Sequence, residues 1–200
     1  TLLRGGLVSK TTTVEADGDG VSLTHVVAEP GGAVRSKEVE LWTDVAGVYR
    51  LVSRVEDPDG AAIGKTWHYS ADGKVELVTE TDGGWTRYVT NAAGRLMLEL
   101  SPLGDQPTNT PFSLCRAVSN DYASVDTNDT QEAKWSEAPR TITEYEAGIP
   151  VARRYRAFYH TAGGEAVEIE ERAATPSAAY GAAGNQRTMR VSRARDDDDP

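Results

Sequence analysis

The chain has 200 residues, 38% of them hydrophobic, a length that favours one folding unit over two independent cores. The formal net charge is −10, which disfavours nucleic acid as a partner because phosphates repel an acidic surface. A single cysteine, Cys115, excludes an internal disulfide framework and suits a buried inert thiol. No run approaches the roughly 18 apolar residues that cross a bilayer, so we expect no membrane span.

Short bursts of alternating apolar and polar residues, separated by Gly and Asp, predict β-strands joined by tight turns. The pattern occurs at Val21 to Val27, Val39 to Trp42, Val48 to Val55, Lys65 to Tyr69, Lys74 to Thr79, Trp85 to Val89, Arg95 to Leu100, Thr141 to Tyr145, Val151 to Tyr159, Ala166 to Glu170 and Arg187 to Ser192. No segment has the apolar periodicity of a long amphipathic helix. We therefore expect an all-β fold, an antiparallel array of hairpins forming a curved strip or part of a shell.

Two stretches break this pattern. Residues 101–139 contain four prolines and many polar residues around a short apolar island, which predicts a long irregular excursion with at most a helical turn. Residues 173–184 are rich in Ala and Gly, and four aspartates precede the final Pro200, so we expect an irregular tail at 173–200 apart from the strand-like Arg187 to Ser192. The expected organisation is a repeat region at 1–172 and a tail at 173–200.

Turn features recur with one period. Gly73 and Gly94, in the aligned stretches Tyr69 to Val75 and Thr90 to Leu96, are 21 residues apart, and so are Gly83 and Gly104. An Asn or Ser side chain can accept hydrogen bonds from the turn backbone while Gly takes the left-handed conformation. With weaker copies upstream and downstream, the predicted turn residues are Asp44, Gly47, Gly60, Tyr69, Gly73, Gly83, Asn91, Gly94, Gly104, Tyr159 and Gly163.

The repeated unit resembles the YD or RHS repeat, in which Tyr-Asp, two residues and Gly-Arg-Leu lead into a strand. Gly94-Arg95-Leu96 matches the end of that motif, whereas Thr90 and Ser70 depart from its Tyr and its Asp. The resemblance is clearest over residues 43–104. It implies an internal segment of a secreted or surface bacterial protein, a scaffold without enzymatic activity or cofactor. Its implied partners are flanking repeats, other copies paired at strand edges, or a toxin cargo enclosed by the shell.

Exposed aromatic residues would instead favour an adhesin module that binds carbohydrate or a host surface. Trp67, Trp85 and Tyr88 are the candidates for stacking on sugar rings, provided that they form an outward row. Repeated aromatics more commonly pack between neighbouring hairpins. A pair of carboxylates converging in a cleft would favour a hydrolase, and no sequence motif indicates one.

Metal and phosphate motifs are incomplete. The stretch from Gly60 to Thr66 has three residues between its glycines, where a phosphate-binding loop has four. Asp17 and Asp19 imitate the start of a calcium loop, but Val26 stands where a bidentate Glu is required, which leaves only a weak cation site. The three histidines are far apart in sequence, so a zinc site would require convergence that only the fold can provide.

Overall fold

The structure is a computed structural model that describes residues 9–130 and 132–192. It is all-β, with thirteen antiparallel strands in one sheet whose spatial order is the chain order. The strands are β1 (Ser9–Asp17), β2 (Gly20–Ala28), β3 (Val34–Val45), β4 (Val48–Glu56), β5 (Ile63–Tyr69), β6 (Val75–Glu80), β7 (Trp85–Thr90), β8 (Leu96–Pro102), β9 (Cys115–Asp121), β10 (Thr141–Glu146), β11 (Ile149–His160), β12 (Ala166–Arg172) and β13 (Gln186–Ser192). The predicted all-β antiparallel hairpin array is confirmed. The aspartates of the predicted acidic end lie outside the described residues.

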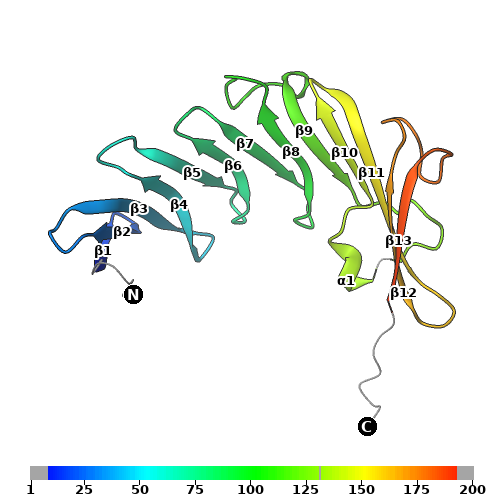
Figure 1. The fold of residues 1–200 in the computed structure, drawn as a ribbon, viewed down its shortest axis with the longest axis horizontal. Coiled ribbons are helices and arrows are strands. Elements are labelled where there is room, and N and C mark those ends of the chain that lie inside the picture. Colours follow the sequence, from blue (N-terminus) through cyan, green and yellow to red (C-terminus); the bar gives the residue numbers. More distant parts are fainter. Residues whose placement is uncertain (1–8, 131, 193–200) are drawn as a thin grey trace, which may run out of the picture. The chain divides into compact units, whose positions relative to one another are not determined.

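Two compact units are distinguished by their internal contacts. Of the described residues, the first comprises 9–88 with 105–108, and the second comprises 89–104, 109–130 and 132–192. Within each unit the strands follow one another in the order of the chain (Figure 1). Each hairpin therefore pairs with the next, as local turns dictate.

The first unit is a single layer of strands. Of its described residues, Trp85 is the hydrophobic side chain that is fully buried, at 4% exposure. Most other apolar side chains on β2 to β6 are half-buried, and every residue of β1 is exposed. The described residues of this unit contain no helix and no second sheet to cover either face.

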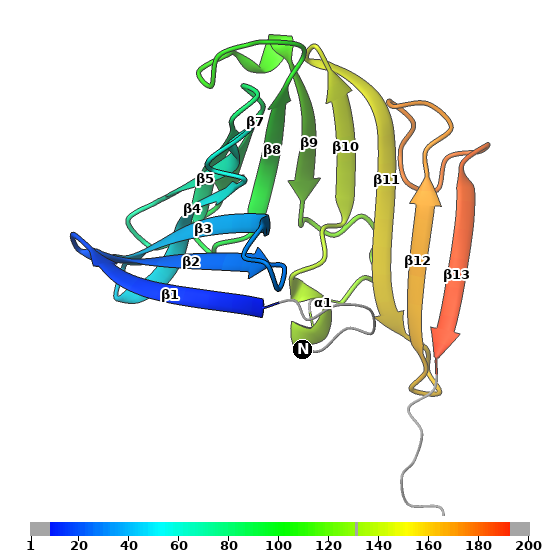
Figure 2. The ribbon, with the colours of Figure 1, turned by 60° about the vertical axis from the view of Figure 1, so that its left-hand side comes forward.

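The second unit has a true core on its last strands. Ala157, Val167 and Ile169 are buried together on β11 and β12, with Tyr180 packed against them from the loop that precedes β13. Neighbouring residues on a strand point to opposite faces, and on the other face Phe158 stacks against Trp135, with ring centroids 5.2 Å apart. Figure 2 shows β8 to β13 side by side, with α1 (Ala133–Ser136) beside them. Both faces of β11 are thus covered around Ala157 and Phe158.

Two strands differ from the sequence-based expectations. Strand β9 lies inside the predicted excursion 101–139, where it pairs with β8 and β10. Its buried residues are small, Cys115 and Ala117, so its hydrophobic signal is weak. Strand β1 is rich in Thr and fully exposed, so its hydrophobic alternation is weaker still. Strand β13 pairs with β12 along its whole length, as expected for the strand-like Arg187 to Ser192, and the described part of the tail before it, 173–185, is irregular. The helical turn expected in the excursion appears as η1 (Phe112–Leu114) and α1.

A buried arginine holds the second half of the excursion on the sheet. The Arg140 and Asp129 side chains are 1% and 0% exposed, and Nε of Arg140 lies 2.7 Å from Oδ2 of Asp129. The other oxygen of Asp129 accepts the backbone N–H of Phe158 on β11 at 2.9 Å. The guanidinium also donates to three carbonyl oxygens of the loop, those of Thr130, Trp135 and Ala138. This network replaces the hydrogen bonds to water that the loop backbone loses on burial.

A buried glutamate holds the loop between β12 and β13. Glu171, 1% exposed, accepts hydrogen bonds from Gly181 N–H at 2.6 Å and Asn185 Nδ2 at 2.5 Å. Arg187 donates to its other oxygen from Nε at 2.7 Å. Burial alone would raise the pKa of this carboxyl, but the hydrogen bonds from Asn185, Gly181 and Arg187 outweigh it and leave the pKa lowered. The loop is therefore closed around an ionised carboxylate.

Replacing Arg140 tests the first of these networks. Arg140→Ala leaves Asp129 buried without its cation and removes the donors to three carbonyls, so we expect a loss of about 3–5 kcal/mol in the free energy of unfolding. The matched control is Arg116→Ala, because Arg116 is 68% exposed and lies 3.8 Å from Glu146. That pair should contribute less than about 1 kcal/mol. Urea unfolding measures both variants, and equal losses would refute a dominant role for Arg140.

The lowered pKa of Glu171 sets a pH dependence. Its stabilising contribution is fully present above about pH 5, because the free carboxyl of an unfolded chain titrates near pH 4.3. It is lost as the pH falls through the lower folded pKa. The difference in unfolding free energy between the wild type and Glu171→Gln should therefore shrink below about pH 4. Glu170→Gln is the control, since Glu170 is exposed and its Oε2 lies 3.7 Å from the guanidinium of Arg156. A difference for Glu171→Gln that stays constant down to pH 2 would contradict the assignment.

Candidate functional site

One hydrogen-bond pattern recurs in hairpin turns of both units. The first residue donates its N–H to the carbonyl of the fifth, and the fourth residue, a glycine, donates to the carbonyl of the first, at 2.7–3.1 Å. The glycines have φ between 78° and 90°. This is the three-residue hairpin loop with a glycine bulge. Turns of this kind begin at Glu29, Ser70, Glu80, Asn91 and Thr161.

In three of these turns a side chain completes the hydrogen bonding. The glycine N–H occupies the first residue's carbonyl, so the fifth residue's N–H needs another acceptor. That acceptor is the side-chain oxygen of the first residue. The bonds run from Lys74 to Ser70 Oγ at 3.1 Å, from Arg95 to Asn91 Oδ1 at 3.0 Å, and from Glu165 to Thr161 Oγ1 at 3.2 Å. The 21-residue repeat thus has a concrete structural basis at Ser70 and Asn91.

Most of the predicted turn glycines adopt the left-handed conformation that the sequence suggests. Positive φ is found at Gly47, Gly73, Gly83, Gly94 and Gly104. Asp44 closes a different, two-residue turn, in which its Oδ1 accepts the Gly47 N–H at 2.8 Å. Gly60 does not have positive φ. A Cβ there would lie 2.3 Å from the exposed Asp57 carboxylate, which would have to rotate away.

The downstream copy of the repeat is shifted by one residue. The left-handed glycine is Gly164, with φ 80°, and the turn begins at Thr161. The predicted pair Tyr159 and Gly163 therefore does not correspond to Tyr69 and Gly73. Two adjacent glycines make this register ambiguous in the sequence. Tyr69 itself donates its hydroxyl to the Leu51 carbonyl at 2.7 Å, which ties β5 back to β4.

The three candidate stacking aromatics do not form one outward row. Trp85 is buried, and its Nε1 donates to the Gln106 carbonyl at 2.7 Å, so the assignment of Trp85 to ligand stacking is wrong. Trp67 and Tyr88 are half-buried. Strand register places them on the face opposite to Trp85, because Trp67 pairs with Val78 whereas Trp85 pairs with the adjacent Thr79.

The candidate cation ligands at the first hairpin do not converge with other ligands. Asp17 and Asp19 are both exposed at the tight turn around Gly18. Among the described residues, the side chains whose ligand atoms come together are those of His25, Glu38 and Glu40. All three lie in the first unit, on β2 and β3.

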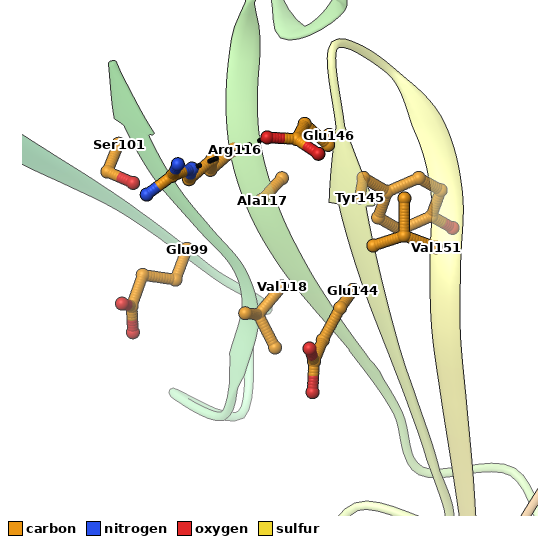
Figure 3. A pocket seen from close by; sticks show the side chains of 9 residues that line it. All are labelled: Glu99, Ser101, Arg116, Ala117, Val118, Glu144, Tyr145, Glu146 and Val151. Atoms are coloured by element: carbon orange, nitrogen blue, oxygen red, sulfur yellow. Dashed lines mark ion pairs between the residues drawn. The ribbon is translucent and has the colours of Figure 1, made fainter. Parts of the chain in front are cut away.

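An open hollow of about 360 Å³ lies over β8 to β11 in the second unit. Figure 3 shows its lining side chains, Glu99, Ser101, Arg116, Ala117, Val118, Glu144, Tyr145, Glu146 and Val151. The register explains the arrangement, since Glu99, Val118 and Glu144 are direct partners across three strands. Ser101, Arg116 and Glu146 form the next row in the same way.

The hollow is acidic and partly neutralised by arginines. Arg116 lies 3.8 Å from Glu146, and Arg154 lies 3.2 Å from Glu144. Glu99 and Glu144 stand two strands apart, about 10 Å at the backbone, near the upper limit for two carboxylates that act with a water between them. Glu144 is held by Arg154, and nothing in the lining encloses a substrate. The arrangement can attract a cationic group, and it lacks a nucleophile activated by a base.

No family model matches the chain, and no curated protein matches it at a significant level. In the described part of the chain, no helix has the length and hydrophobicity needed to cross a membrane. The fold and the recurring turn define this chain as an all-β array of sequential hairpins with a repeat-like turn.

Sequence reasoning missed the arginine and glutamate networks and the convergence of His25 with Glu38 and Glu40. The sequence carries a partial signal for the convergence of His25 with Glu38 and Glu40. His25 lies in one predicted strand, and Glu38 and Glu40 flank Val39 at the start of the next, with alternation that places both on one face. The register between the strands was not available, because it depends on a bulge between Val27 and Ala28.

Asn91→Ala tests the side-chain closure of the repeated turn. The substitution leaves the N–H of Arg95 without the acceptor at 3.0 Å, so we expect the free energy of unfolding to fall by about 1 kcal/mol. Ala92→Ser, at an exposed position of the same turn, is the control and should change it by less than about 0.5 kcal/mol. Amide exchange of Arg95 should accelerate in Asn91→Ala alone. Unchanged exchange there would show that water serves the turn equally well.

Proposed function

We propose that the chain is a structural β-scaffold segment, of the YD or RHS repeat type, from a larger secreted or surface bacterial protein. One observation carries the proposal. All thirteen strands lie in chain order in one antiparallel sheet, and the same glycine turn joins several of the hairpins. An array of this kind grows by adding hairpins at its ends, and each addition requires only local contacts.

The two edges of the sheet support growth of this kind. Strands β1 and β13 lie at the two ends of the strand order, and every residue of both is exposed. A free edge presents unpaired N–H and C=O groups that bind another strand. Exposed apolar side chains, Val14 at 63% and Met189 at 59%, accompany them. Flanking repeats, or another copy of the chain, would satisfy both edges.

The uncovered first unit supports a role as part of a larger assembly. Large apolar side chains are exposed there, among them Val34 at 59%, Tyr49 at 56% and Ile63 at 64%. A sheet is stabilised when its apolar side chains pack on a second layer. In a shell, the enclosed cargo or the remaining repeats would provide that layer. A toxin domain is the cargo that the resemblance to RHS proteins suggests.

The alternative of a carbohydrate-binding adhesin module has less support. Burial of Trp85 removes one of its three candidate stacking residues, and the remaining two, Trp67 and Tyr88, are half-buried. A hydrolase has less support still, since the hollow in the second unit is open and its Glu144 is held by Arg154.

Hydrogen exchange on a longer polypeptide tests the scaffold proposal. Amide exchange is compared between this chain alone and the same chain within its complete reading frame. We expect the outward-facing amides of β1 and β13 to exchange at least about tenfold more slowly in the longer protein, because new strands pair with them. Amides of β6 and β10, which already have partners on both sides, are the internal control. Equal exchange at the edges in both proteins, or a frame that encodes no further strands, would contradict the proposal.

A further inference from the structure

We propose that His25, Glu38 and Glu40 form a binding site for a divalent transition-metal ion such as Zn²⁺. The donor atoms of the three side chains all lie within 4.8 Å of one another, and all three residues are half-buried. An imidazole with two carboxylates is a ligand set that suits Zn²⁺. The site goes beyond the scaffold role and does not depend on it.

Strand register creates the site. His25 on β2 is the direct partner of Glu38 on β3, and Glu40 follows two residues along β3 on the same face. Nε2 of His25 lies 3.9 Å from Oε2 of Glu40, too far for a hydrogen bond. Two ligands at about 2.0–2.1 Å from a tetrahedral zinc ion lie about 3.4 Å apart. Small side-chain rotations would therefore close the three donors around an ion.

Neighbouring side chains orient two of the ligands. Thr12 Oγ1 lies 3.0 Å from Nδ1 of His25, and when that nitrogen carries the proton, Nε2 presents its lone pair toward the carboxylates. Trp42 Nε1 donates to Oε2 of Glu40 at 3.0 Å. Partners of this kind fix the tautomer and the direction of metal ligands and raise affinity.

The local charge favours a cation. Glu38, Glu40 and Glu56 lie on this face with Arg54, which pairs with Glu38 and lies 3.8 Å from Glu56. Strand register also places Lys10 and Lys65 on this face, and Lys65 pairs with Glu80. Carboxylates therefore outnumber the cationic side chains around the trio. Arg54 competes with a metal ion for Glu38, so it sets the affinity of the site without being a ligand.

Three protein ligands leave a fourth position for water. A surface hollow of about 450 Å³ adjoins the trio at Glu38, between β3 and β4. We assign the ion a structural role because its ligands come from two neighbouring strands. It would link β2 to β3 in the unit that lacks a covering layer. An ion that binds only the folded chain stabilises it by mass action.

Calorimetric titration of the full chain with Zn²⁺ tests the site. We expect one ion per chain and a loss of affinity of at least about tenfold in His25→Gln and in Glu40→Gln. His68→Gln is the matched control, since His68 is an exposed strand histidine of the same unit, and it should bind as the wild type does. Arg54→Gln should bind Zn²⁺ more tightly than the wild type. Absence of stoichiometric binding, or equal effects of His25→Gln and His68→Gln, would overturn the proposal.

A second measurement needs no variant and so does not depend on a substituted protein folding. The chain has three histidines, and their ring resonances can be followed by NMR during addition of Zn²⁺. We expect the His25 ring signals to shift first, and those of His68 and His160 to remain in place until excess metal is present. Simultaneous shifts of all three would show non-specific binding and would also overturn the proposal.

Discussion

The backbone pairing of each strand with its neighbour in the chain is the constraint on which the rest of this structure depends. All thirteen described strands pair with their neighbours in the chain, and no connection crosses over another strand. It requires turns that reverse the chain within a few residues, and the glycine-bulge turn does this at Ser70, Asn91 and Thr161 with a side chain that replaces a lost backbone acceptor. Because the pairing is local, each hairpin adds to the sheet beside the preceding one, and among the described residues β1 and β13 each pair with one neighbour.

Much of the fold could be predicted from the sequence because its determinants are local. Alternation located the strands that bury larger apolar residues, and the period between Gly73 and Gly94 located two equivalent turns. Prediction failed where the local signal was weak or ambiguous. The exposed Thr-rich β1 and the small-residue β9 gave little alternation. The adjacent glycines Gly163 and Gly164 allowed either register, and hydrogen bonding selected the second.

The parts of the structure that could not be predicted depend on residues distant in sequence. Arg140 with Asp129, and Glu171 with Arg187, are polar pairs that a linear reading assigns to the surface. Arg140, Asp129 and Glu171 are buried because an irregular loop folds over the sheet and needs acceptors or donors for its own backbone. The meeting of His25 with Glu38 and Glu40 likewise follows from strand register. The scaffold proposal depends on pairing between strands that are adjacent in the chain. The metal proposal depends on side chains that the strand register brings together, so either proposal can fail without the other.

In-order strand pairing is the central claim, and cross-strand nuclear Overhauser effects between assigned protons in solution test it most directly. The structure predicts contacts between registered partners, such as Leu77 with Arg87 in the first unit and Ala157 with Ile169 in the second. Contacts that link strands out of chain order, or a shift of register that pairs Leu77 with Thr86, would contradict the account.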